Sequence, residues 1–159
     1  VYMEHKSLWP IEDEVPDSDN YLVQIGTSRC SRVGNDITIV SWSQSVHLCD
    51  QAADELDEVV IIAEIIDLRT LWPWDEKAVC DSVNRTGRLL VVHEAVQACG
   101  FGAEIVATVA ERLGRSLLVP PRRLGGPRIP VPYAKSLEDV YRVPVSRIVA
   151  TVNQMLTTS

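Results

Sequence analysis

The stretch from Ile66 to Glu94 constrains the fold more than any other part of the sequence. It holds two strongly apolar runs, each followed at once by charged residues, with a shorter amphipathic segment between them. Continuous apolar runs of this kind are typical of parallel strands that are covered on both faces. A strand, a helix and a second strand in this order form a βαβ unit, which brings the carboxyl ends of both strands to one edge of a sheet. The sequence therefore predicts that a polar cluster gathers at this edge: Asp67, Arg69, His93 and Glu94.

The rest of the chain continues the alternation of strands and helices. Buried strands are predicted over residues 37–42, 59–66 and 88–93, a short strand near 121–124, and one exposed strand within 21–31. Helices are expected after Ser43, between Asp75 and Gly87, from Gly100 and from Pro144, because these residue types favour helix ends. The first helix has an apolar stripe at i, i+3, i+4 and i+7, formed by Cys49, Ala52, Ala53 and Leu56. This pattern predicts a doubly wound α/β domain with a mostly parallel sheet and right-handed crossovers.

The first twenty residues differ in composition from the rest. They hold six acidic residues against one lysine, so this segment carries five of the seven net negative charges of the 159-residue chain. We interpret residues 1–20 as an acidic linker with a remnant of a preceding domain, and residues 21–159 as the folded domain. Because the chain begins with Val1 rather than Met, we expect it to be a piece of a longer protein.

Composition excludes several classes of function. A net charge of −7 argues against a nucleic-acid partner, since phosphate binding requires an excess of Lys and Arg. The four cysteines contain no CxxC pair, which favours reduced, structural thiols over a zinc site or a disulfide framework. No apolar run approaches the roughly 20 residues of a membrane span. We expect a cytoplasmic protein, or one of the mitochondrial matrix if the source is eukaryotic.

The residues by themselves do not identify a catalytic centre. His93 and Glu94 form a candidate acid/base pair, but charges at strand ends more often pair locally or contact another subunit, and we favour that interpretation. The run from Gly100 to Gly102 lacks the third glycine of a dinucleotide fingerprint, because Ile105 occupies that position. We therefore predict no catalytic, cofactor-binding or metal-binding residue in this chain.

Residues 21–159 nevertheless carry many ordered matches to one family. The chain resembles the C-terminal domain of the transketolase family, and in particular the β subunits of thiamine-dependent 2-oxoacid dehydrogenases. The matching segments are Asp36–Trp42, Val46–His47, Ile66–Leu71, Pro73–Asp75, Ser82–Val83, Thr86–Leu89, His93–Ala95, Gly100–Ile105, Pro130–Tyr133, Leu137–Asp139 and Tyr141. Glu4–Lys6 also resembles the family's segment that closes the preceding pyrimidine-binding domain.

The resemblance implies a three-layer α/β/α domain with a sheet of about five strands. In this family, thiamine diphosphate and Mg²⁺ lie between the α subunit and the N-terminal domain of the β subunit, which also holds its catalytic residues. The resemblance thus implies a non-catalytic domain that binds no cofactor itself. Its expected partners are the α subunit, a second β subunit and the lipoyl acyltransferase core of an enzyme that oxidatively decarboxylates a 2-oxoacid.

Within the family, Pro73–Asp75, Cys80 and His93–Ala95 are closest to β subunits that act on branched-chain 2-oxoacids. A pyruvate or acetoin type, and a free-standing interaction module, remain as alternatives. Three positions depart from the family pattern in ways that concern local structure: Cys99 stands where a glycine is common, and Gly125 and Arg128 replace a common Thr and Asp.

Overall fold

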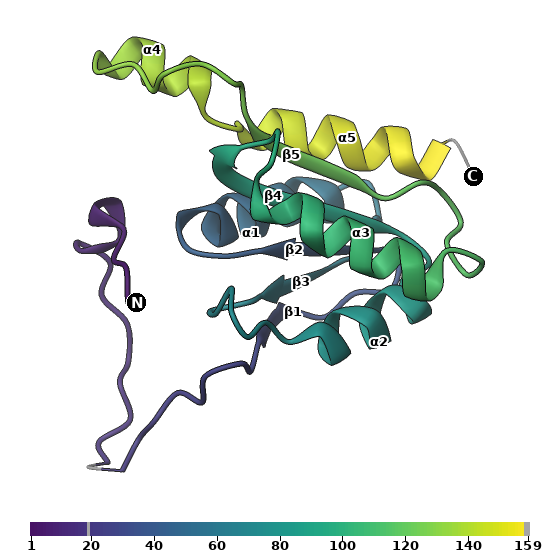
Figure 1. The fold of residues 1–159 in the computed structure, drawn as a ribbon, viewed down its shortest axis with the longest axis horizontal. Helices are drawn as coiled ribbons and strands as arrows, with labels where there is room; N and C mark the ends of the chain where they lie inside the picture. The colour runs from purple at the N-terminus through teal and green to yellow at the C-terminus, as the bar shows by residue number, and fades with distance from the viewer. Residues whose placement is uncertain (19, 158–159) are drawn as a thin grey trace.

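Strands and helices alternate along most of the chain, as the sequence pattern predicts. The computed structural model describes residues 1–18 and 20–157 (Figure 1). Its elements are η1 (Lys6–Leu8), β1 (Arg29–Arg32), β2 (Ile37–Ser41), α1 (Gln44–Asp57), β3 (Ala63–Asp67), α2 (Glu76–Thr86), β4 (Leu89–Val96), α3 (Phe101–Leu113), β5 (Arg122–Gly126), α4 (Lys135–Tyr141) and α5 (Val145–Thr157).

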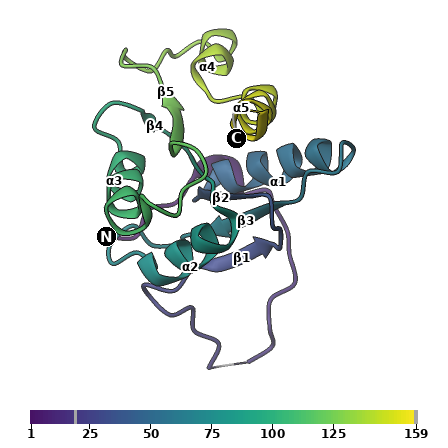
Figure 2. The same cartoon turned by 90° about the vertical axis from the view of Figure 1, so that its right-hand side faces the viewer.

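The five strands of the described residues form one sheet in the order β1-β3-β2-β4-β5. All neighbouring pairs are parallel except β1 and β3, which are antiparallel. Helices α1 and α5 cover one face of the sheet, and α2 and α3 cover the other (Figure 2). The predicted doubly wound, three-layer α/β/α architecture is confirmed.

Alternation along the central strands divides the interior into two cores. In β4, Leu90 and Val92 belong to the core under α1 and α5, whereas Leu89 and Val91 belong to the core under α2 and α3. Successive residues of a strand point to opposite faces, so a parallel strand between two helix layers needs apolar residues at every position. The apolar stripe predicted for α1, from Cys49 to Leu56, is fully buried in the first of these cores.

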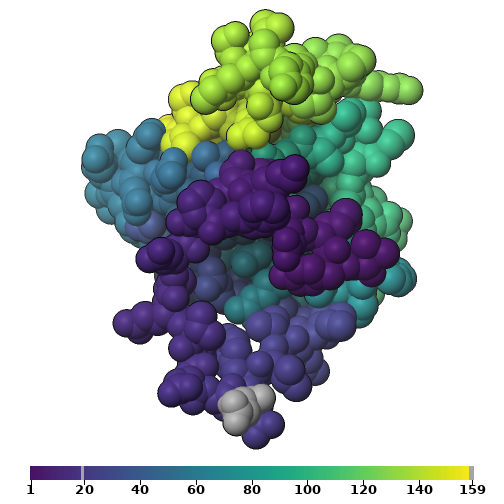
Figure 3. Space-filling view, turned by 90° about the vertical axis from the view of Figure 1, so that its left-hand side faces the viewer, coloured from purple at the N-terminus to yellow at the C-terminus, as the bar shows by residue number. Residues whose placement is uncertain are grey.

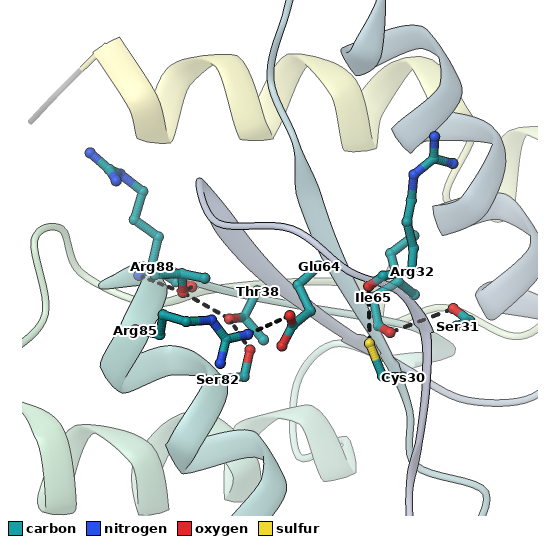
Figure 4. A network of polar contacts seen from close by, with 10 residues as sticks. Cys30, Ser31, Arg32, Thr38, Glu64, Ile65, Ser82, Arg85 and Arg88 are labelled. Carbon is teal, nitrogen blue, oxygen red and sulfur yellow. Dashed lines mark hydrogen bonds and ion pairs between the residues drawn. The ribbon is translucent and has the colours of Figure 1, made fainter.

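Buried polar contacts attach α2 to the amino-terminal part of the sheet (Figure 4). The Thr38 hydroxyl of β2 lies 2.6 Å from the Ser82 hydroxyl and 2.8 Å from the Thr86 hydroxyl. Beside it, the buried carboxylate of Glu64 accepts a hydrogen bond from Arg85. Because buried hydroxyls and carboxylates need partners, these contacts fix the position of α2 on the sheet.

Several boundaries differ from the expectations. The strand predicted from residue 59 begins at Ala63, because Val59 and Val60 lie exposed in the turn that follows α1. The exposed strand expected within 21–31 is displaced to Arg29–Arg32. Ser43 precedes α1, but with φ at 58° its side chain makes no capping hydrogen bond. By contrast, Asp75 caps α2 by accepting from the Ala78 N–H, and Gly87 ends that helix in the left-handed conformation.

Two parts of the chain lie outside the three layers. The short helix α4, which the sequence pattern did not predict, lies beyond the β5 edge of the sheet (Figure 2). The N-terminal segment forms η1 near the start of the chain, and an extended stretch then leads to β1 (Figure 1).

Candidate functional site at the carboxyl edge of the sheet

The parallel strands β2, β3 and β4 end at the same edge, where open α/β sheets bind their ligands. Ser41, the last residue of β2, pairs in register with Asp67, the last residue of β3. The Ser41 hydroxyl donates to the Val92 carbonyl of β4 at 2.9 Å, which joins the strands below the edge. Since this buried hydroxyl is already bonded to the backbone, Ser41 is a structural residue of the edge.

Asp67 and Arg69 lie together at the carboxyl end of β3. Asp67 Oδ1 accepts a hydrogen bond from the Arg69 backbone N–H at 3.1 Å, and Arg69 itself has φ at 57°. Burial raises the pKa of the Asp67 carboxyl, while that N–H bond and the charges of Arg29 and Arg69 act to lower it. The Arg69 residue is exposed. The hydrogen bond between Asp67 and the Arg69 backbone therefore fixes the turn after β3, and the Arg69 side chain is accessible to another molecule.

His93 does not lie on the polar rim: it is fully buried. Its ring stacks on Trp42, with ring centroids 5.2 Å apart and an interplanar angle of 17°. Trp42 in turn meets Phe101 edge to face at 6.1 Å. Burial lowers the pKa of His93 from its ordinary value of 6.5, although the Ala95 backbone acts in the opposite direction. The imidazole is therefore neutral at pH 7 and belongs to the core.

Three glycines make the space for this ring. A Cβ atom at Gly100 or Gly125 would lie 2.8 Å from His93 Cε1, and one at Gly102 would lie 2.6 Å from His93 Nε2. These glycines come from the start of α3 and from β5, so two segments far apart in the sequence close around one side chain. The departure at Gly125 thus has a structural reason, because any side chain there would also approach the Ala95 carbonyl at 2.7 Å.

Glu94 points to the opposite side of β4 from His93, since neighbouring residues of a strand alternate in direction. Its Oε2 lies 2.9 Å from His5 Nε2, and its Oε1 lies 4.0 Å from Arg142 Nε. Arg142 also binds Glu138 of α4 at 2.6 Å. The hypothesis that His93 and Glu94 form an acid/base pair is wrong, because one is in the core and the other links β4 to the N-terminal segment and to α4.

The same contacts place the N-terminal segment over the carboxyl edge. His5 is the N-cap of η1, and its Nδ1 accepts a hydrogen bond from the Ser7 N–H at 3.2 Å. Figure 3 shows the first residues of the chain, in purple, lying across this face of the domain. Neither His5 nor Arg142 was predicted to belong to the edge. The matched Glu4–Lys6 segment was the one signal that could have indicated the role of His5.

Among residues 1–18 and 20–157 no group of three or more His, Cys, Asp and Glu residues could hold a metal ion. Cys30, Cys49, Cys80 and Cys99 are free thiols in this structure, and burial raises the pKa of Cys49 to about 12. In the part of the chain that the structure describes, no helix is both long and apolar enough to cross a bilayer.

The sequence matches the family described as transketolase, C-terminal domain, over residues 26–148. It is 37% identical over 156 residues to the β subunit of the acetoin:2,6-dichlorophenolindophenol oxidoreductase of Cupriavidus necator, covering 98% of this chain and 46% of that protein. It is 34% identical over 157 residues to the β subunit of the 2-oxoisovalerate dehydrogenase of Bacillus subtilis, covering 98% and 48%. The chain thus spans about half the length of these curated relatives.

A solved structure has the same fold. It is a split-gene transketolase in the form of an inactive β4 tetramer, with a TM-score of 0.72 and 24% sequence identity, and the likeness covers 90% of this chain and 47% of that chain. At this identity the comparison shows the architecture alone.

Proposed function

The chain belongs to the transketolase C-terminal domain family, and from this premise we propose that it is the assembly and docking domain of a thiamine-dependent 2-oxoacid dehydrogenase β subunit. The complete enzyme would oxidatively decarboxylate a 2-oxoacid and pass the acyl group to a lipoyl arm. Thiamine diphosphate and Mg²⁺ would be bound by the α subunit and the preceding domain of the β subunit. Within residues 21–159, the domain would supply contacts to other chains.

The observation that carries this proposal is a similarity, along nearly the whole chain, to β subunits whose names contain different substrates. The acetoin-type and the 2-oxoisovalerate-type subunits both match over 98% of the chain, at 37% and 34% identity. What the three sequences share over this length is therefore their place in a β subunit rather than a substrate. We propose a branched-chain 2-oxoacid as the substrate of the complete enzyme, on the resemblance of Pro73–Asp75, Cys80 and His93–Ala95 to that type; the pyruvate and acetoin types are the alternatives.

The exposed apolar residues around α4 support a docking role. Tyr133 and Val140 are 104% and 82% exposed, and Ile129, Val131 and Leu137 are more than half exposed. Apolar side chains gathered on an outlying segment are typical of protein contacts. We define Ile129, Val131, Tyr133, Leu137 and Val140 as the α4 surface and propose that another subunit covers it.

The carboxyl edge supplies a second, polar contact. Arg69 is exposed, Asp67 and Glu94 are half-buried, and the buried His93 fixes the strand that carries Glu94. We propose that Asp67, Arg69 and Glu94 contact a neighbouring subunit, with His93 as the residue that positions this rim. The His5–Glu94 contact would then join the preceding domain to the same rim.

Purification from the source organism tests the proposal. The protein, tagged at its chromosomal locus, should copurify in stoichiometric amounts with a dehydrogenase α subunit and a lipoyl acyltransferase. The complex should turn over branched-chain 2-oxoacids faster than pyruvate or acetoin. Leu137→Glu with Val140→Glu should release these partners, whereas Val33→Glu with Val59→Glu, at exposed apolar positions outside the α4 surface, should not. Purification without either partner would contradict the proposal.

Calorimetry addresses the cofactor separately. The 159-residue chain titrated with thiamine diphosphate and Mg²⁺ should give no binding heat, because the groups that hold this cofactor would lie in other parts of the enzyme. A stoichiometric heat that disappears on omission of Mg²⁺ would show a cofactor site within this chain.

A free-standing interaction module is the second candidate. In that case the contact between His5 and Glu94 would hold the N-terminal segment against the carboxyl edge of its own domain. Sequencing the gene upstream of the codon for Val1 separates the two. A continuous reading frame that encodes a pyrimidine-binding domain favours the dehydrogenase subunit.

A further inference from the structure

Two neighbouring hollows lie along the free edge of β5, on the far side of the sheet from β1. The first, of about 380 Å³, extends from the end of β5 to the start of α5, and the second, of about 470 Å³, extends along β5 and the middle of α5. Gln97, Arg123 and Arg147 line both hollows. The two hollows therefore form one continuous groove, which we call the β5 groove.

The charge of the β5 groove is opposite to that of the chain. Four arginines line it, namely Arg122, Arg123, Arg128 and Arg147, and no Asp or Glu does. The whole chain has 22 acidic against 15 basic residues. The described residues offer these four guanidiniums no carboxylate partner, whereas Arg32, Arg85 and Arg142 each bind one. A concentration of arginines without carboxylate partners in an acidic protein indicates an anionic ligand.

Arg147 adds an independent argument. It lies in the first turn of α5, where the helix dipole is positive and favours acidic side chains, and that turn contains none. A cation at this position is unfavourable for the helix by itself, so folding alone does not account for it. An anion bound in the groove would offset the repulsion.

The geometry of the edge indicates the form of the ligand. In the described sheet β5 has a strand neighbour only on its β4 side, so a further strand could pair with its other side where α4 does not cover it. The amino-terminal part of β5, at Arg122 and Arg123, is the less buried part of the strand. Arg122 binds Gln154 of α5 at 2.9 Å, and Arg123, the next residue of β5, donates from Nε to the Gln97 carbonyl at 3.4 Å. Neighbouring residues of a strand leave it on opposite faces. The guanidiniums thus flank the edge on both faces, and a five-residue strand spans roughly 17 Å along it.

We propose that the β5 groove docks an acidic, extended segment of a partner polypeptide, which adds a sixth strand to the sheet. Backbone hydrogen bonds to β5 would supply the register, and alternate carboxylates would pair with the arginines on either face. The inference goes beyond the proposed function: it assigns a third docking surface, which adjoins the α4 surface at Val140 and differs from it in being lined by arginines. It holds whether or not the chain is part of a dehydrogenase.

Two alternative roles for the groove arginines predict different results. Arginines can protect an edge strand from aggregation, in which case no ligand binds. A small polyanion such as a triphosphate could also occupy a groove of this size, in which case the backbone of a peptide is irrelevant. The orientation of Arg122 and Arg123 towards opposite faces of one free strand favours an extended chain over a compact anion.

The test uses a fluorescein-labelled decapeptide of alternating glutamate and threonine and the full 159-residue chain. Fluorescence anisotropy at low ionic strength should show saturable binding at a ratio of one to one. Arg122→Glu with Arg147→Glu should weaken binding at least tenfold. Arg69→Glu with Arg115→Glu, an equal change of charge at exposed arginines outside the groove, should weaken it less than threefold. Circular dichroism of each variant confirms that it is folded.

Two further titrations distinguish strand addition from these alternative roles. A peptide with the same side chains but N-methyl groups at alternate residues should bind at least tenfold more weakly, because it cannot donate hydrogen bonds to an edge strand. Equal affinity of this peptide would overturn strand addition. Tripolyphosphate that binds as tightly as the unmodified peptide would show a small-anion site instead, and the absence of saturable peptide binding would show that the arginines only protect the edge.

Discussion

Gly102→Ala would bring two physical effects of known size into opposition: helix propensity and steric overlap with His93. Alanine is favoured over glycine within a helix by up to about 1 kcal/mol, so helix propensity predicts that the substitution stabilises α3. The structure predicts the opposite. The new methyl group would lie 2.6 Å from His93 Nε2 and 2.7 Å from His93 Cδ2, whereas Cβ contacts closer than 3.4 Å are uncommon. One of the two groups must therefore move by nearly 1 Å.

The His93 ring cannot move without a cost. It is stacked on Trp42, and the backbones at Gly100 and Gly125 close around its Cε1 atom. Overpacking of a tightly enclosed site costs about 1–3 kcal/mol. This exceeds the gain in helix propensity, which is smaller in the first turn. We expect Gly102→Ala to lower the free energy of unfolding by about 1–2 kcal/mol.

Urea denaturation followed by tryptophan fluorescence and by circular dichroism measures this change. For a slope near 2 kcal/mol per molar urea, the midpoint should fall by about 0.5–1 M. A double-mutant cycle identifies the cause: in a His93→Ala background the penalty of Gly102→Ala should disappear, since the ring that collides has been removed. Ala107→Gly, at an exposed position of α3, calibrates the propensity of this helix. Stabilisation by Gly102→Ala, or a penalty that persists without the ring, would refute the steric argument.

Three further predictions concern protonation and backbone strain. Burial lowers the pKa of His93 in the folded state below its ordinary 6.5, so the unfolded state binds the proton more readily. The contribution of His93 to stability is therefore fully present above about pH 6.5 and is lost as the pH falls. In a series of urea midpoints measured at different pH values, His93→Gln should flatten this decrease. Burial raises the pKa of Asp67, so the effect of pH on stability is opposite to that of His93: the folded state loses stability as Asp67 ionises with rising pH. Asp67→Asn should therefore gain stability relative to the parent protein as the pH rises from 4 to 7. A constant difference across that range would contradict the assignment. Cys99 is exposed with φ at 61°, a left-handed conformation that costs most residues energy, so Cys99→Gly should stabilise the protein by about 0.5–1 kcal/mol and raise the Tm by about 1–4 °C. An unchanged Tm in calorimetry would show no strain there.

The architecture could be predicted from the sequence because the spacing of the apolar residues and the residues that end helices were both clear. The apolar stripe from Cys49 to Leu56 has a period that only a helix can bury on one face, and Asp75 and Gly87 mark the two ends of α2 by their capping chemistry. Boundaries were less certain where apolar residues continue past an element. Val59 and Val60 resemble the start of a strand, but the turn after α1 exposes both, and no local pattern distinguishes them from Ile65.

The candidate site was predicted only in part, for a related reason. That Asp67, Arg69 and Glu94 lie near strand ends follows from the order of elements along the chain. Whether His93 faces solvent or the core depends on the helix packed against that side of β4 and on how closely it approaches. The contact of Glu94 with His5 joins residues 89 positions apart, and nothing local in the sequence indicates it.

The sequence alone determined that this chain builds a layered, mostly parallel sheet, because continuous apolar strands alternating with amphipathic helices can bury their surfaces in no simpler way. Only the tertiary structure decided which polar groups are available for contact. Glycines at positions 100, 102 and 125 enclose His93. The packing of α5 beside the edge strand β5 brings Arg147 next to Arg122 and Arg123 in one groove. Burial and juxtaposition arise from the packing of segments far apart in the chain, and they are therefore properties of the assembled fold.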